Sequence, residues 1–402
     1  MSWAIANELA ELEAAGLRRR LRVLGSPQGT VVNLDGREVV NFSSNDYLGL
    51  AASAELRAAF AEGVRRYGAG SGASRLVCGG MAPHHELEEA LAAFKGTQAA
   101  LTFSSGFAVA LGTIPALMGT QDVIILDKLC HASLVDAARM CGATIRVFPH
   151  NHLGKLEKLL MVSCSSARRV LVVTESIFSM DGDAAALAEI VELKERHGAW
   201  LMLDEAHGVG VLGPQGRGLA AALGLEQRVE LQMGTLSKAF GLSGGYIAAS
   251  RNVIDLLINK ARSFIYTTAP PPALAHAAGV SLKLIQAPEG DRRRVKLNAN
   301  LQSFRAQGLG TQHTSQSAIL PIIIGNETLA MHLSARLLDE GFLIPAIRYP
   351  TVARGSARLR LTLSAAHEAF QIEALAMRLR CATAELADSE ALPEAFEVSE
   401  GG

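Results

Sequence analysis

The chain has no cysteine framework for disulfides. Its 402 residues include five cysteines, and none of these cysteines stands in a CxxC pair. This sparse and unpaired usage is typical of proteins that stay in a reducing compartment. We therefore expect no structural disulfide and a cytoplasmic location.

The chain also lacks a charge excess of either sign and a long apolar run. With 38 basic and 39 acidic residues, it has no net field that would draw it to nucleic acid or to an anionic membrane. The nearest candidate for a membrane span, residues 106–119, is interrupted by Gly112, Thr113 and Pro115. Residues 1–20 have the pattern of an amphipathic helix rather than of a signal or transit peptide. We expect a soluble protein without nucleic-acid or membrane partners.

Short apolar runs recur from about residue 97, and most are separated by segments of helical length. The runs are AALTF (99–103), DVIIL (122–126), TIRVF (144–148), VLVVT (170–174), WLMLD (200–204), VELQM (229–233) and YIAAS (246–250). Such alternation predicts an α/β fold with a mostly parallel sheet covered by helices on both faces. In that architecture, active sites lie at the carboxyl ends of the strands.

The pattern divides the chain into four parts. Residues 1–45 are expected to form an N-terminal helix and a hairpin arm, because TVVNLDGREVVNF alternates around an Asp-Gly turn. Residues 46–287 would form a large domain, and residues 288–383 a smaller α+β domain. The acidic tail, 384–402, is expected to be disordered.

Polar residues follow the apolar runs at the points where strands are expected to end. They are Gly106 and Phe107, His131, Glu175 and Ser179, Asp204 and His207, and then Thr235, Ser237 and Lys238. Taken singly, each has an ordinary structural explanation, since a lone histidine is usually hydrogen-bonded structure and an aspartate after a strand is often a helix cap. As a set, they match the needs of pyridoxal 5′-phosphate.

Each part of that cofactor has a partner in the set. The backbone N–H groups of Gly106 and Phe107 would face the phosphate at a helix start, and Thr235 and Ser237 would add hydroxyls. Lys238 lies among small residues, so the cofactor can approach its amine, and desolvation would lower the pKa of that amine.

Three further side chains would act on the cofactor ring. Asp204 would keep the ring nitrogen protonated, so that the ring can withdraw electrons. His207 would hydrogen-bond the phenolic oxygen, and His131 would stack on the ring face. The set therefore predicts a pyridoxal-phosphate enzyme with Lys238, His131 and Asp204 as catalytic residues.

Two other motifs do not point to ligands. GAGSGASRLVCGG (68–80) follows a helical segment rather than a strand, so it does not predict a dinucleotide site. The histidine pairs 84/85 and 150/152 have no carboxylates or cysteines at ligand spacing, so we predict no metal site.

Four segments of the chain resemble the α-oxoamine synthase family of fold type I pyridoxal-phosphate enzymes. They are NFSSNDYLGL (41–50), ESIFSMDGD (175–183), LDEAHGVGVLG (203–213) and TLSKAFG (235–241). The resemblance covers about residues 1–380 and implies a seven-stranded, mostly parallel sheet in a large domain with a smaller C-terminal domain. It also implies a pyridoxal-phosphate-dependent acyltransferase in which Lys238 carries the cofactor. Gly106, Phe107, Ser179, Asp204, His207 and Thr235 would be the other cofactor contacts.

The same resemblance implies the substrate contacts. Arg360 would grip the carboxylate of the amino acid, a bidentate task suited to guanidinium, and His131 would also touch substrate. Arg348 and Thr351 would contact the acyl substrate, although Tyr349 stands where the family would have proline. Arg18 is our choice for the acyl-chain contact, with Arg19 and Arg20 as the alternatives.

The resemblance implies a decarboxylative Claisen condensation of an amino acid with an acyl thioester. The segments at 41–50 and 71–79 favour alanine with a pimeloyl thioester, and the alternative is glycine with an acetyl thioester; coenzyme A and carrier protein both stay open as the acyl carrier. A non-catalytic subunit is disfavoured because Lys238, Asp204 and His207 are all present. The family implies a homodimer, with Ser74 and Arg75 near the interface and Thr267 and Thr268 reaching the neighbouring phosphate.

Overall fold

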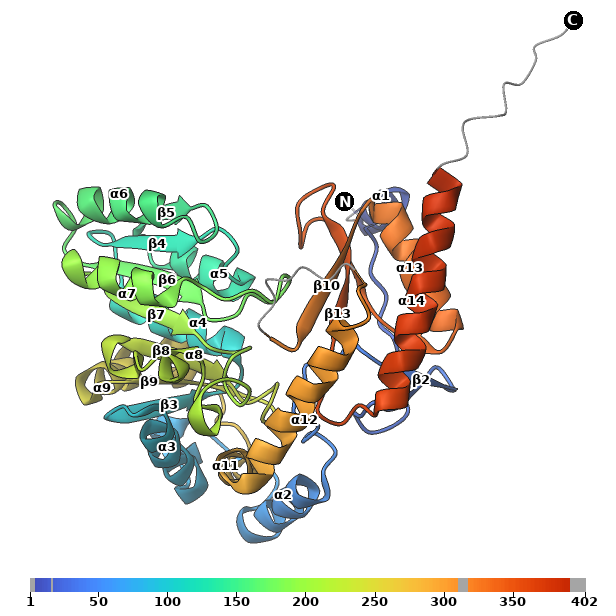
Figure 1. Cartoon of the computed structure of the whole chain (residues 1–402). Helices are drawn as coiled ribbons and strands as arrows, with labels where there is room; N and C mark the ends of the chain where they lie inside the picture. The colour runs from blue at the N-terminus through green and yellow to red at the C-terminus, as the bar shows by residue number, and fades with distance from the viewer. Residues whose placement is uncertain (1–3, 16, 310–316, 391–402) are drawn as a thin grey trace, which may run out of the picture.

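A computed structural model of the chain describes residues 4–15, 17–309 and 317–390. Its centre is a seven-stranded sheet with the order β3-β9-β8-β7-β6-β4-β5, in which only β9 runs antiparallel to its neighbours (Figure 1). The strands are β3 (Ala99–Phe103), β4 (Val123–Asp127), β5 (Thr144–Phe148), β6 (Val170–Glu175), β7 (Trp200–Asp204), β8 (Leu231–Thr235) and β9 (Gly245–Ala249). All seven predicted strands are confirmed, with ends within about two residues, because buried strands are continuous apolar runs.

Helices cover both faces of this sheet. One face packs against α4 (Gly106–Leu117), α5 (Ala132–Met140), α9 (Arg251–Lys260) and α10 (Arg262–Ile265). The other face packs against α6 (Leu153–Cys164), α7 (Leu187–Arg196) and α8 (Leu219–Ala222). The two apolar layers bury both faces of the sheet. Because the strands other than β9 share one direction, their carboxyl ends lie at the same edge.

A third apolar core joins the sheet to the rest of the chain. It includes α2 (Ala54–Tyr67), α3 (Ala82–Lys95), α11 (Pro272–Gln286) and α12 (Pro288–Arg305). Figure 1 shows α12 leading from the large sheet to a second part. That part contains the antiparallel sheet β10 (Ile319–Gly325), β13 (Ala357–Thr362) and β12 (Ala346–Ile347), with α13 (Glu327–Asp339) and α14 (Ala369–Glu390).

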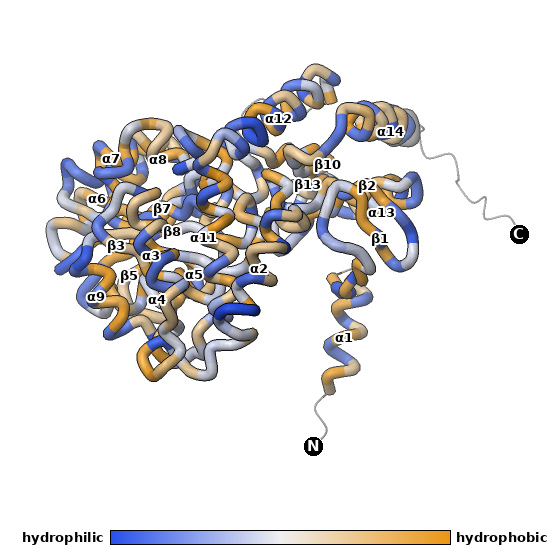
Figure 2. Tube along the Cα trace, turned by 90° about the horizontal axis from the view of Figure 1, so that it is seen from below, coloured by the Kyte–Doolittle hydropathy of each residue, from blue (hydrophilic) through white to orange (hydrophobic). Residues whose placement is uncertain are grey.

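The predicted N-terminal hairpin is confirmed, but its location was not predicted. Strands β1 (Val31–Leu34) and β2 (Arg37–Asn41) pair antiparallel around Asp35 and Gly36, both of which have positive φ. Strand β2 then pairs in parallel with β11 (Phe342–Leu343), so the hairpin joins the C-terminal part. Helix α1 (Ile5–Ala14) buries none of its residues and projects from the body (Figure 2).

Helix α14 extends further than expected. It continues to Glu390, so residues 384–390 of the predicted acidic tail are helical rather than disordered. Residues 391–402 of that tail lie outside the described residues. Across the described ranges, we find no helix that combines the length and apolar composition needed to span a bilayer.

Candidate active site

The carboxyl ends of the parallel strands surround a cavity of about 240 Å³. The residues that line it lie at or just after the carboxyl ends of β3, β4, β6, β7 and β8. Strand β9 contributes none of them, because it is antiparallel and its carboxyl end lies at the opposite edge of the sheet. The structure brings together nine of the residues selected from the sequence, namely Gly106, Phe107, His131, Glu175, Asp204, His207, Thr235, Ser237 and Lys238. Ser105 and Ser133 line the same cavity.

One end of the cavity is suited to an anion. Helix α4 begins there, and Ser105 caps it by accepting a hydrogen bond from the Ala108 N–H at 3.1 Å. The N–H groups of Gly106 and Phe107 have no acceptor within the helix because they belong to its first turn. With the positive end of the helix dipole, they form a site for a phosphate group.

Hydroxyl groups complete this end from the β8 side. The Thr235 hydroxyl donates to the Gly244 carbonyl at 2.8 Å and lies 2.7 Å from Ser237 Oγ. Because the Thr235 proton goes to that carbonyl, the contact with Ser237 is a hydrogen bond that the Ser237 hydroxyl donates to Thr235 Oγ1. The sequence singled out both residues, and the structure shows how their hydroxyl groups are paired.

A hydrogen-bonded chain leads away from Lys238. Lys238 Nζ lies 2.7 Å from His207 Nε2, and His207 Nδ1 lies 2.5 Å from the Tyr47 hydroxyl. Tyr47 in turn donates to Asn45 Oδ1 at 3.2 Å. Burial and the nearby Lys238 charge hold the pKa of His207 well below its usual value, so its ring is neutral. One tautomer satisfies the whole chain, with Nε2 accepting from the Lys238 ammonium and Nδ1–H donating to Tyr47.

Lys238 itself is desolvated. Burial lowers the pKa of its amine from 10.5 to about 8, while the carboxylates of Asp204 and Glu175 act in the opposite direction. Desolvation is the cause that we expect from the sequence, and burial is the largest cause of the lowered pKa in the structure. An amine with this pKa has a substantial neutral fraction near physiological pH.

Two buried carboxyl groups lie side by side at the base of the cavity. Asp204 and Glu175 are direct partners in the pairing of β7 and β6. Burial raises the pKa of Asp204, whereas the Lys238 charge and a hydrogen bond from the Ala206 N–H at 2.9 Å favour its ionised form. Burial and the Asp204 charge raise the pKa of Glu175 well above its usual value. Asp204 is therefore the group that carries the charge, and Glu175 is a site residue for which we predict no role from the sequence.

His131 combines the structural and functional interpretations. Its Nδ1 caps α5, accepting from the Ser133 N–H at 3.3 Å and lying 2.8 Å from Ser133 Oγ. Its backbone N–H donates to Glu175 Oε1 at 2.5 Å. Burial lowers the pKa of the ring. The cap fixes a neutral imidazole at the cavity wall, with Nε2 left for other partners.

Arg360 lies in β13 and is buried against this network. Its Nε donates to the Ser179 carbonyl at 2.6 Å, and its other nitrogens donate to Thr362 Oγ1 at 3.0 Å and to Asn45 Oδ1 at 3.2 Å. Within the described ranges, no carboxylate forms an ion pair with Arg360. A buried guanidinium with only neutral acceptors is suited to a carboxylate ligand. Asn45 also links it to the Lys238 chain.

Four other predicted residues lie outside the first cavity. Ser179 and Thr351 line a separate cavity of about 310 Å³ next to it. Arg348 is half-buried in the loop after β12, and its carbonyl accepts from the Thr351 N–H at 3.0 Å. Arg18 follows α1 in the N-terminal arm, where it pairs with Glu13 at 3.0 Å. Within a single chain, the structure does not bring Arg18 to either cavity.

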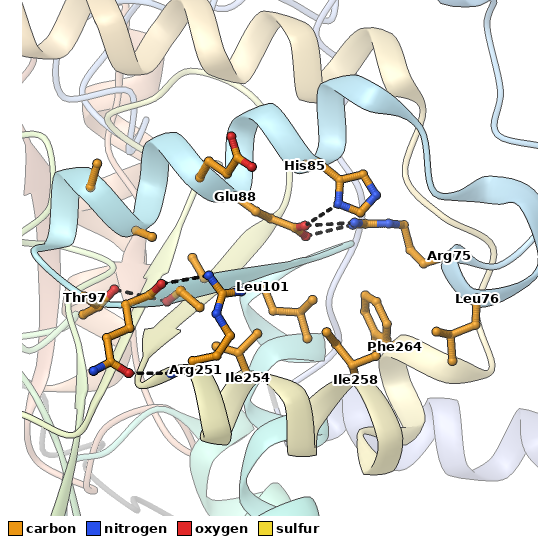
Figure 3. A pocket seen from close by; sticks show the side chains of 16 residues that line it. Arg75, Leu76, His85, Glu88, Thr97, Leu101, Arg251, Ile254, Ile258 and Phe264 are labelled. Carbon is orange, nitrogen blue, oxygen red and sulfur yellow. Dashed lines mark hydrogen bonds and ion pairs between the residues drawn. The ribbon is translucent and has the colours of Figure 1, made fainter.

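A larger cavity, of about 450 Å³, lies between α3 and α9 and contains none of the predicted cofactor contacts. Figure 3 shows Arg75 at its wall, directed toward Glu88. The pair is buried, with Arg75 Nη1 2.8 Å from Glu88 Oε1, and Glu88 also accepts from the Thr102 N–H at 2.9 Å. Glu88 therefore holds the end of β3 that leads into the anion site.

A second buried ion pair, between Lys95 and Glu205, lies next to Asp204 in the chain. Lys95 donates to Glu205, the residue after Asp204, and to the Arg217 carbonyl. Both side chains are essentially inaccessible to water, and Glu205 Oε1 also accepts from the Ala220 N–H at 3.0 Å. The pair connects α3 to the turn that carries Asp204 and His207.

Comparison with known proteins identifies relatives of the chain. The family described as aminotransferase class I and II matches residues 37–379. The 8-amino-7-oxononanoate synthase of Geobacter sulfurreducens is 48% identical over 93% of this chain and 96% of its own length. Among solved structures, serine palmitoyltransferase from S. paucimobilis, with bound PLP-myriocin aldimine, is 29% identical and has a TM-score of 0.88 over 96% of this chain and 98% of its own.

A second solved structure carries the same name as the curated relative. The 8-amino-7-oxononanoate synthase of Francisella tularensis is 28% identical, with a TM-score of 0.75, over 88% of this chain and 99% of its own. The family match, the sequence identity and the fold agree with one another. The chain belongs to the α-oxoamine synthase family of fold type I pyridoxal-phosphate enzymes.

Proposed function

We propose that the chain catalyses the decarboxylative condensation of L-alanine with a pimeloyl thioester, the 8-amino-7-oxononanoate synthase reaction of biotin synthesis. The observation that carries this proposal is the 48% identity, over 93% of the chain, with a relative of that name. The intact set of buried polar groups around Lys238 supports a catalytic rather than a regulatory role.

The donor set of the cavity fits pyridoxal 5′-phosphate. The N–H groups at the start of α4 suit a phosphate. Asp204 offers a carboxylate to a protonated ring nitrogen, and the Lys238 amine lies between Asp204 and His207 in the same cavity. When bound, this cofactor supplies an aldehyde for amines and a conjugated ring that withdraws electrons from the substrate Cα.

Other residues of the chain would bind the substrates, accept a proton and exclude water. Arg360 would bind the carboxylate of the amino acid and thereby orient the bonds at its Cα. Lys238 Nζ, with a pKa of about 8, is suited to take the Cα proton at neutral pH. His131 would cover one wall of the cavity and limit the access of water. Thr351 borders the second cavity, and Arg348 is joined to it by the hydrogen bond within the same loop; both are our candidates for acyl contacts.

A substrate-pair assay tests the proposal. Alanine, glycine and serine would each be combined with pimeloyl, acetyl, succinyl and palmitoyl thioesters, and kcat/KM would be measured for every pair. Alanine with the pimeloyl thioester should give the highest value. A higher value for glycine with the acetyl thioester would replace this proposal by the alternative within the family. Borohydride reduction followed by peptide mapping should place the cofactor label on Lys238, and the Lys238→Ala variant should lose it.

We further propose that the working form is a cytoplasmic homodimer. Large apolar side chains are exposed in the single chain, with Phe107 at 43%, Tyr266 at 71% and Val77 at 77%, and Phe107 lines the cavity. Burying them against a second copy would exclude water from the site and bring Thr267 and Thr268 toward the neighbouring phosphate. The five free cysteines suit a reducing compartment. Sedimentation of the active protein should show a dimer, and an active monomer would contradict the proposal.

A further inference from the structure

His150 is held between two carboxylates outside the cavity. Its Nδ1 lies 3.1 Å from Asp127 Oδ1, and its Nε2 lies 2.7 Å from Asp183 Oδ2. Asp127 is the last residue of β4 and is fully buried, whereas Asp183 belongs to the segment after β6. From the sequence, His150 and His152 form a pair for which we predict no metal site. The structure gives it a different role, as a bridge between strand ends.

The bridge requires a doubly protonated imidazole because each ring nitrogen faces a carboxylate. The pKa of His150 is raised to about 10, since hydrogen bonds and charge from Asp127 and Asp183 outweigh the opposing effect of burial. The other groups that face the ring are the Asn151 amide and the edge of the Phe178 ring. At neutral pH the bridge therefore consists of two charge-assisted hydrogen bonds.

Asp183 has few other anchors for its side chain. Its second oxygen, Oδ1, is buried and has no hydrogen-bond partner among the described residues. The backbone around it is closed by bonds from the Phe178 N–H to the Asp183 carbonyl at 3.0 Å and from the Gly182 N–H to the Phe178 carbonyl at 2.8 Å. His150 is thus the charged side chain that links residues 177–184 to the end of β4, beside the Asn151 amide, which donates to the Ala184 carbonyl at 3.0 Å, and the buried Phe178 ring.

The opposite side of residues 177–184 contacts the small domain. The Ser179 carbonyl accepts from Arg360 Nε at 2.6 Å, and Asp181 forms an ion pair with Arg358. Both arginines lie on β13. Residues 177–184 therefore connect the ends of β4 and β5 to Arg360, the arginine whose hydrogen-bond acceptors are all neutral.

We propose that His150 is a positioning residue for Arg360: by bridging Asp127 and Asp183, it holds residues 177–184 where the Ser179 carbonyl orients the guanidinium. Arg360 then meets the carboxylate of the amino acid without first having to reorganise. This inference rests on the proposed function in so far as Arg360 is the residue that binds the amino acid.

The test compares His150→Asn with His152→Asn. His152 is exposed and accepts only from the Lys155 N–H at 3.2 Å, as the cap of α6, a position that asparagine fills well. Hydrogen exchange of the peptide that covers 177–184 would be measured in each apoprotein at pH 7. His150→Asn should speed this exchange roughly tenfold or more, and His152→Asn should leave it unchanged.

Kinetics of the cofactor-loaded variants supply the second measurement. In His150→Asn, KM for the amino acid should rise roughly tenfold while kcat and the cofactor absorbance change little, because Arg360 is displaced and Lys238 is not. The amino acid used is the one selected by the substrate-pair assay, and the exchange measurement needs no substrate. An error in the proposed substrate therefore leaves this test intact. Unchanged exchange in 177–184, or an unchanged KM, would overturn the inference.

Asp183→Asn provides a second route if His150→Asn does not fold. It keeps an acceptor for His150 Nε2 but removes one of the two charges that face the ring. Exchange in 177–184 should increase in this variant also, by less than in His150→Asn, and KM should rise in the same proportion. Wild-type exchange and KM in Asp183→Asn would equally overturn the inference.

Discussion

The ionisation of Lys238 gives the most direct test of how the site works. Its pKa is lowered from 10.5 to about 8 by burial. At pH 7, a pKa of 8 leaves about 10% of the amine neutral, compared with about 0.03% for an ordinary lysine. The reactive form is thus enriched roughly 300-fold. The apoprotein should therefore attach pyridoxal 5′-phosphate with a rate that rises with pH and levels off just above pH 8.

The replacement Asp204→Asn separates two effects on the pKa of Lys238, the burial of its amine and the charge of the Asp204 carboxylate. The Asp204 carboxylate raises the pKa of Lys238, so its removal should lower that pKa further and move the midpoint of the rate profile below that of the wild type. Attachment near pH 6.5 should become faster, even though the cofactor has lost the partner of its ring nitrogen and turnover falls. Asp255→Asn, which removes an exposed carboxylate on α9, is the matched control and should keep the wild-type midpoint.

The assay is stopped-flow absorbance of the apoproteins mixed with pyridoxal 5′-phosphate between pH 5.5 and 9.5, with borohydride trapping to verify the attachment site. A wild-type rate that still rises about tenfold per pH unit up to pH 9.5, as an ordinary lysine would give, would mean that burial does not act on this amine. A midpoint that rises in Asp204→Asn would show that the sign of the carboxylate effect is wrong. Either result would refute the electrostatic account of Lys238.

Three further substitutions test other parts of the site. Arg360→Lys should raise KM for the amino acid roughly 10- to 100-fold with a smaller effect on kcat, because a point charge cannot replace a bidentate guanidinium; steady-state kinetics measure this, and an unchanged KM would remove Arg360 from the substrate site. Ser105→Ala should lower the free energy of unfolding of the apoprotein by about 1 kcal/mol through loss of the α4 cap, whereas Ser105→Asn should stay near the wild type in urea titrations. Lys95→Met should cost about 3–5 kcal/mol by leaving the buried Glu205 carboxylate unpaired, and adding Glu205→Gln should recover much of that loss; equal stability of the single and double variants would argue against the ion pair.

The amino-acid sequence was sufficient for the sheet and for most of the cavity lining. Strands such as 99–103 and 170–175 are fully buried apolar runs, and that pattern is local. Once the sheet is known to be parallel, residues that follow different strands must meet at one edge. For this reason the sequence predicts that Gly106, His131 and Lys238, which are far apart in the chain, belong to one site.

Other features of the fold and of the site depend on contacts between residues far apart in the chain, which a local sequence pattern does not predict. The pairing of β2 with β11 joins segments about 300 residues apart. The chain of hydrogen bonds from Lys238 through His207, Tyr47 and Asn45 to Arg360 brings together three distant segments. Arg18 was assigned by family resemblance, and the structure leaves it on an exposed arm.

The sequence thus determined which residue types stand at the strand ends, because strand periodicity and composition are properties of neighbouring residues. Tertiary structure alone decided their ionisation and their partners, such as the two carboxylates around His150 and the neutral acceptors around Arg360. The physical reason is that desolvation and Coulomb interactions depend on distance in space, which the order of residues along the chain does not specify.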